Sequence, residues 1–98
     1  MGIEIQIQYF GSIRAAAKKS EEKTEFAADT TIYHLLQKLA SLYDDNFRGE
    51  IFDKDGEELR DDLMVTLNRV IVSHADALEI KLNSGDALAL FPIFPGGG

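Results

Sequence analysis

The first residues of the chain alternate between apolar and polar side chains, which is the pattern of a β-strand with one buried face. Glutamate and glutamine hold the polar positions, and the apolar positions are Ile3, Ile5, Ile7 and Tyr9. We expect this strand to continue to Phe10 and to stop at Gly11. Because side chains alternate strictly along a strand, burial of the isoleucines places Phe10 on the opposite, polar face.

The period of the pattern changes to that of a helix after Asp29. Thr31 can cap the first turn, and a single apolar stripe follows at Ile32, Leu35, Leu36, Leu39 and Leu42. The sequence therefore predicts one main amphipathic helix over residues 31–43.

Shorter patterns predict the remaining elements. Residues 12–20 indicate a short helical or turn segment, and residues 23–27 a second strand. Further strands are expected at 64–68 and 70–72, around a turn at Asn68 and Arg69, and at 87–91 after a turn at 83–86. The acidic segment 44–62 is predicted to be a long connection containing a short hairpin, with apolar anchors at Phe47, Ile51, Phe52 and Leu59.

This order of elements is typical of an α+β fold, with a mixed sheet of four to five strands packed on one main helix. The 98 residues form one domain over residues 1–92, followed by a flexible tail over 93–98. In the last strand, strict alternation buries Leu88 and Leu90 and turns Phe91 outward, to the same face as Phe10. Two interpretations of Phe91 remain open: it forms a partner surface with Phe10, or it folds over Ile93 or Phe94 of the tail.

Composition narrows the function classes. The chain has no cysteine, which excludes a disulfide framework, a thiolate zinc site and a thioester or persulfide on a side chain. Its net charge of −7 argues against nucleic acid as a partner and favours partners with basic surfaces. The sequence shows neither a signal peptide nor an apolar run of membrane-spanning length, so we expect a cytoplasmic protein.

The body of the chain carries no convincing catalytic, metal or cofactor pattern. His34 and His74 lack a third ligand at metal spacing. The segment from Asp53 to Gly56 does not have the spacing of a calcium loop, and no glycine-rich phosphate loop is present. Ser73 lies beside His74 without an evident positioned base and orienting acid. We therefore expect no metal, no bound cofactor and no catalytic residue.

The tail is the strongest candidate for chemistry. The chain ends in Pro95, Gly96, Gly97 and Gly98, which together present an unhindered carboxylate on a flexible stalk. Glycine has no Cβ, so such a stalk can thread a narrow channel. The alternative is a disordered terminus or a cloning scar.

Several motifs in this order resemble the family of the molybdopterin synthase small subunit and ThiS. These are ubiquitin-like β-grasp proteins, and the small archaeal modifier proteins belong to the same group. The resemblance runs from Ile3 to Gly98 and is weakest between Asp44 and Leu63. It rests on the segments 9–14 (YFGSIR), 30–32 (TTI), 65–68 (VTLN) and 84–92 (SGDALALFP), followed by the terminal glycines.

The resemblance implies that an activating enzyme of the ubiquitin-activating type uses ATP to adenylate the Gly98 carboxylate. A sulfur carrier would then receive a terminal thiocarboxylate for the large subunit of molybdopterin synthase. A protein modifier would instead be joined through Gly98 to lysines of target proteins. A third possibility is a binding module without terminal chemistry. By position, the docking patch of such small subunits matches Phe10, Ile71 and Phe91.

The tail departs from the family pattern. Two adjacent prolines are frequent in the family, whereas Ile93 and Phe94 separate Pro92 from Pro95 here, and three glycines follow. This difference concerns how the stalk docks on its partners.

Overall fold

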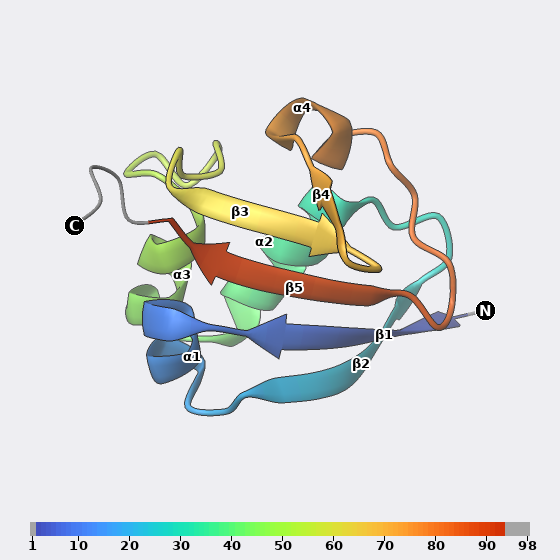
Figure 1. Cartoon of the computed structure of the whole chain (residues 1–98), viewed down its shortest axis with the longest axis horizontal. Helices are drawn as coiled ribbons and strands as arrows, with labels where there is room; N and C mark the ends of the chain where they lie inside the picture. The colour runs from blue at the N-terminus through green and yellow to red at the C-terminus, as the bar shows by residue number, and fades with distance from the viewer. Residues whose placement is uncertain (1, 94–98) are drawn as a thin grey trace.

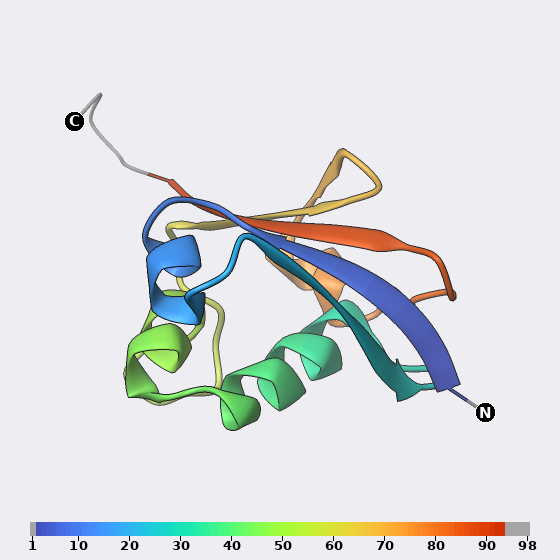
Figure 2. The ribbon, with the colours of Figure 1, turned by 90° about the horizontal axis from the view of Figure 1, so that it is seen from below.

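The computed structural model describes residues 2–93, which form a five-stranded mixed sheet with helices on one side (Figures 1 and 2). The strands lie in the order β2-β1-β5-β3-β4. The central pair β1·β5 is parallel, and the other neighbouring pairs are antiparallel. The strand bounds are β1 Gly2–Tyr9, β2 Glu21–Ala27, β3 Leu63–Leu67, β4 Val70–Val72 and β5 Ala87–Pro92.

The predicted α+β class, the mixed sheet, the main helix and the short helical segment after β1 are confirmed, and a further helix also covers the inner face. Figure 2 shows these three, α1, α2 and α3, on the same side of the sheet. None of the helices within residues 2–93 is long and apolar enough to cross a bilayer. The helix bounds are α1 Gly11–Ala17, α2 Ile32–Leu42, α3 Asp45–Ile51 and α4 His74–Ala77.

The main helix α2 begins as predicted, because the Thr31 side chain accepts a hydrogen bond from the His34 backbone N–H at 3.2 Å. Its stripe is fully buried except at one position. Leu42 is 63% exposed, so its assignment to the core was wrong. The helix diverges from the sheet toward its last turn (Figure 2), and Tyr43 rather than Leu42 reaches back to β2.

Helix α3 is the largest departure from the sequence prediction, which expected a connection over residues 44–62. The Asp44 side chain caps the helix by accepting from the Phe47 N–H at 3.1 Å. Phe47 and Ile51 are fully buried beneath it. These two residues give only one helical spacing, so the periodic signal was too short to recognise. The predicted hairpin is reduced to a single bridge between Phe52 and Leu59.

A partly buried carboxylate joins β1, β2 and the end of α2. Glu22 accepts hydrogen bonds from the hydroxyls of Tyr9, at 2.5 Å, and Tyr43. Partial burial raises the pKa of Glu22, but the hydrogen bonds from Tyr43 and Tyr9 outweigh it and hold that pKa below its ordinary value. The Phe47 ring packs 5.6 Å from Tyr9 and 4.6 Å from Tyr43, between ring centroids. The same cluster therefore fastens α3 to the sheet.

Substitutions at two leucines of α2 test which face of this helix is buried. Leu36→Ala should lower the free energy of unfolding by about 2 to 5 kcal/mol, because Leu36 is fully buried in the core. Leu42→Ala removes the same atoms from an exposed position and should change stability by less than about 0.5 kcal/mol. Urea denaturation of both variants measures the difference. Equal losses would contradict the assigned buried face.

Candidate docking face and carboxyl-terminal exit

The outer face of the sheet carries no helix within residues 2–93 (Figure 2). The register aligns Gln8 of β1, Ala89 of β5, Thr66 of β3 and Ile71 of β4 in one row across this face. We refer to it below as the outer face. It combines polar side chains from β1 with apolar and small ones from β5, β3 and β4.

Phe10 and Phe91 stack on each other on the outer face. Their ring centroids are 4.3 Å apart and their planes differ by 10°. Phe10 is 39% exposed and Phe91 is half-buried. The parity argument is thus confirmed for both rings. In the competing interpretation Phe91 would fold over the tail, but its ring partner is Phe10 and Ile93 is 44% exposed. Phe94 lies outside the described residues.

Ile71 lies on the same face, but the structure does not bring it to the aromatic pair. It is 67% exposed on the edge strand β4, two strands from β5, with Thr66 of β3 between them. Sequence reasoning missed Met64, which pairs directly with Phe91 and is half-buried on the outer face. Only the register of two distant strands places Met64 there, so no local pattern could have identified it.

Small residues on β5 leave a shallow hollow beside Phe91. Its volume is about 340 Å³, and Ala87 and Ala89 form its floor. Side chains of the neighbouring strands and the β3–β4 turn surround it: Gln6, Gln8, Thr66 and Arg69. A partner side chain could enter this hollow while packing against the Phe91 ring.

Gly11 fixes one side of the exit of β5. Phe10 has extended backbone angles and its N–H donates to the Leu90 carbonyl at 3.2 Å, which carries the pairing past the end of β1. Gly11 then turns the chain into α1 with φ of 56°. A Cβ at Gly11 would lie 2.7 Å from Cγ of Pro92. Glycine is therefore needed both for the backbone angle and for the close approach of Pro92.

Asp62 fixes the other side of the exit. The Ile93 N–H donates to the Asp62 carbonyl at 2.6 Å. Arg60 donates to both carboxylate oxygens of Asp62, at 2.8 and 2.9 Å, and to the Gly49 carbonyl at 3.1 Å. The hydrogen bond from Arg60 holds the pKa of Asp62 below its ordinary value. The chain thus leaves the domain at a defined point. The predicted tail residues Pro95, Gly96, Gly97 and Gly98 lie outside the described residues.

Two of the other polar candidates, His74 and Ser73, contact backbone groups. A ring nitrogen of His74, Nε2, is 2.7 Å from the Leu63 carbonyl, and His34 is exposed on α2. Ser73 caps α4 by accepting from the Asp76 N–H at 3.0 Å. Over the part of the chain that the structure describes, no three histidine or acidic side chains are grouped to hold a metal ion.

The central parallel pair of first and last strands and the helices on one face define a ubiquitin-like β-grasp fold. The sequence profile of the ThiS family matches residues 7–97, and the chain belongs to this family.

Named relatives agree with this assignment. Small archaeal modifier protein 3 of Haloferax volcanii is 27% identical over 95 residues, which cover 97% of this chain and 100% of the relative. The solution structure of the HVO 2177 protein of the same organism has 27% identity and a TM-score of 0.82, covering 98% of this chain and 88% of that one. The crystal structure of its SAMP1 has 26% identity and a TM-score of 0.81, covering 96% and 99%.

Two glycine substitutions with opposite expected effects on stability test the backbone geometry where β5 ends. Gly11→Ala should lower the free energy of unfolding by at least about 1 kcal/mol, because alanine is strained at this positive φ and meets Pro92. Gly49→Ala, in α3 with open space around its Cβ, should raise stability by up to about 1 kcal/mol. Thermal and urea denaturation measure both effects. A neutral Gly11→Ala variant would rule out the tight contact at the exit.

Proposed function

We propose that the protein is a ubiquitin-like carrier whose reactive group is the carboxylate of Gly98. The supporting observation is the ThiS family match, which runs through β5 and into the terminal glycines. In the first step a carboxylate oxygen attacks the α-phosphorus of ATP, an acyl phosphate bond forms and pyrophosphate leaves. The mixed anhydride with AMP is a far better electrophile than the carboxylate. An activating enzyme of the ubiquitin-activating type supplies ATP and catalysis, so this chain is not itself an enzyme.

In the function that we favour, a nucleophilic sulfur displaces AMP and leaves a thiocarboxylate at Gly98. The protein then donates this sulfur during synthesis of the molybdopterin of molybdenum and tungsten cofactors, as the small subunit beside the synthase large subunit. The segment from Gly85 to Pro92 supports this choice, because its sequence is typical of that subunit. We place this activity in the cytoplasm, where ATP is available.

The alternative is conjugation, in which a lysine amine displaces the leaving group and forms an isopeptide bond through Gly98. The names of the relatives favour it, since two of them are small archaeal modifier proteins. Both functions share the adenylation step and differ only in the nucleophile. One chain can serve both.

The outer face is the proposed docking surface for the activating enzyme and for the large subunit. Its stacked rings of Phe10 and Phe91 lie directly before the end of β5 at Pro92. A partner that binds over the two rings would therefore also direct the tail toward its own active site. Ile71 extends the surface toward the β4 edge. The hollow beside Phe91 gives the partner a place for one inserted side chain.

Intact mass spectrometry of protein isolated from its own cells separates the two functions. A sulfur carrier shows a fraction in which one oxygen is replaced by sulfur. A modifier shows a series of larger conjugates with Gly98 joined to lysines. Neither species, with the activating enzyme present, would favour a binding module without terminal chemistry.

Deletion of Gly97 and Gly98 tests the reactive terminus. We expect loss of ATP–pyrophosphate exchange with the cognate activating enzyme, because the remaining carboxylate cannot reach the nucleotide. Unfolding should be unchanged, since the two deleted glycines lie outside residues 2–93, which contain the strands and helices that the structure describes. The full-length protein is the matched control. A truncated protein that still supports exchange would exclude the proposed terminus.

Charge substitutions test the docking face. Phe10→Glu and Phe91→Glu should each lower affinity for the activating enzyme about thirtyfold or more, as expected for a central aromatic in an interface. Loss of the ring stacking should cost the isolated domain only about 0.5 to 1.5 kcal/mol. Leu42→Glu, an exposed residue on the helical side, is the control and should leave affinity unchanged. Titration calorimetry and thermal denaturation provide both measurements. If Phe10→Glu binds normally, Phe10 is not part of the interface.

A further inference from the structure

A second apolar groove lies away from the outer face, between the start of α2, the loop after α3 and α4. Its volume is about 420 Å³, and its apolar lining comes from Tyr33, Leu59, Ala75 and Leu78. Leu78, which lines the groove, is 55% exposed. Figure 1 shows α4 and this loop along the same edge of the molecule. Exposed apolar grooves with polar rims are typical of binding sites.

The walls of the groove are held in place by hydrogen bonds. The Tyr33 hydroxyl donates to the Glu57 carbonyl and accepts from Nε2 of Gln37 at 3.1 Å, which fixes the acidic loop to α2. His74 Nε2 is within 2.7 Å of the Leu63 carbonyl, which fixes the start of α4 to β3. The groove therefore exists before any ligand binds, so a partner does not have to order it.

The charge around the groove indicates which kind of partner it binds. Residues 44–62 contain nine acidic and three basic residues, so they carry six of the seven net negative charges of the chain. Three carboxylates line the groove itself: Glu57, Glu58 and Asp61. Within residues 2–93 the ion pairs involve other carboxylates, at Lys19–Glu22, Arg60–Asp62 and Lys81–Asp29. The groove carboxylates thus remain available to an incoming cation.

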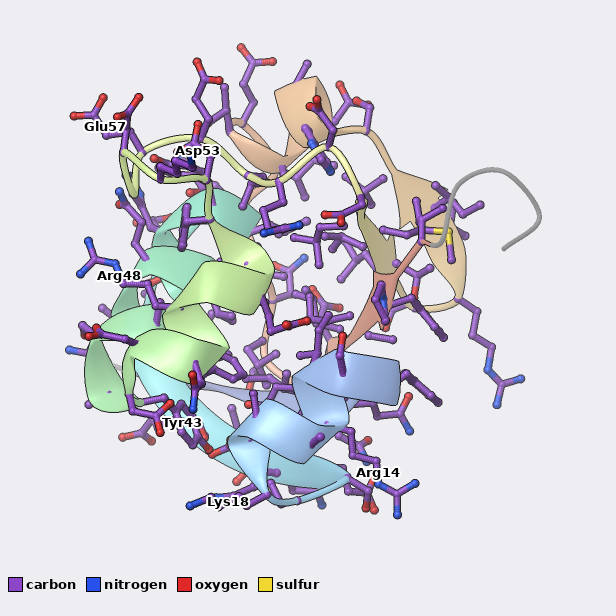
Figure 3. The ribbon with its side chains drawn as sticks, turned by 90° about the vertical axis from the view of Figure 1, so that its left-hand side faces the viewer. Arg14, Lys18, Tyr43, Arg48, Asp53 and Glu57 are labelled. Atoms are coloured by element: carbon purple, nitrogen blue, oxygen red, sulfur yellow. The ribbon has the colours of Figure 1, made fainter. Side chains whose placement is uncertain are left out.

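Three basic residues lie in the same segment, Arg48, Lys54 and Arg60, and Arg60 is paired with Asp62. Figure 3 shows Glu57 and Asp53 at one corner with Arg48 beside them, while Arg14 and Lys18 lie at the opposite end. Because acidic residues outnumber basic ones nine to three over residues 44–62, the groove has a net negative potential. It repels nucleic acid phosphates and anionic membrane surfaces and attracts basic peptide.

We propose that this groove binds a segment of a partner protein in which lysine or arginine residues flank an apolar side chain. The apolar side chain packs on Leu78 and Tyr33, and the cations pair with Glu57, Glu58 and Asp61. The groove is on the helical side of the sheet, so the partner can remain bound while the outer face is occupied. The inference does not depend on chemistry at Gly98.

A peptide titration of the full chain tests the proposal. The probe is the capped peptide Lys-Lys-Ser-Leu-Ser-Lys-Lys, compared with one in which serine replaces leucine and one in which glutamate replaces the lysines. In ¹H–¹⁵N spectra the probe should shift the amides of Tyr33, Leu59 and residues 75–78. Each comparison peptide should bind at least about tenfold more weakly than the probe. Added salt should lower the affinity for the probe, because it screens the charges.

Paired variants distinguish binding in the groove from nonspecific electrostatic attraction to the acidic surface. Leu78→Ser should lower the affinity for the probe peptide about tenfold or more. Leu42→Ser, which changes another exposed leucine, should leave that affinity unchanged. The double change Glu57→Gln and Glu58→Gln should weaken binding of the probe more than Glu4→Gln and Glu25→Gln, which remove the same charge from β1 and β2. Thermal denaturation confirms that each variant is folded.

Several results would overturn the proposal. These are shifts spread over all acidic residues with no effect of Leu78→Ser, shifts confined to the outer face, or no shift at millimolar probe. Sedimentation of the chain without peptide provides a further test. A self-association that Leu78→Ser abolishes would assign the groove to a second copy of this chain and not to a basic partner.

Discussion

The parallel pairing of β1 with β5 is the constraint on which the rest of the structure depends. It joins Gln6 to Ala87 and continues in register to Tyr9 and Leu90, across about eighty residues of sequence. The inner side chains of both strands form the centre of the core. On the other side, the same register brings Phe10 against Phe91 and Gly11 against Pro92. One backbone alignment thus builds the core, the aromatic pair and the exit of the chain.

A parallel pair also dictates what lies on each face. Parallel strands cannot be joined by a tight turn, so the chain between them must cross over the sheet. Here the crossover carries α2 and α3 along one face, which buries that face, and no described element covers the other (Figure 2). The result is two surfaces of different chemistry. The outer face presents aromatic and small side chains, whereas the helical side presents an apolar groove with a carboxylate rim.

Two clusters of polar side chains join elements of this structure. Glu22 connects β2 to Tyr9 of β1 and to Tyr43 at the end of α2, and the hydrogen bonds favour its ionised form. Burial and the contact with Glu22 raise the pKa of Tyr9, so the tyrosine remains the donor. The Arg60–Asp62 pair has a comparable role where β5 ends. Both clusters stabilise positions at which the sheet meets its neighbours.

The sequence by itself determined the features that depend on local periodicity. Alternation in β1 and β5 predicted which side chains face outward, the helical stripe predicted α2, and the motifs with the terminal glycines predicted the family. Tertiary structure decided what depends on the alignment of distant segments. Examples are the stacking of Phe10 on Phe91, the distance of Ile71 from that pair, Met64 beside Phe91, and the exposure of Leu42. Helix α3 escaped prediction because only Phe47 and Ile51 mark its apolar face, and burial of Phe47 against Tyr9 and Tyr43 stabilises it. Alternation fixes the face of a side chain, but only strand register fixes its neighbours.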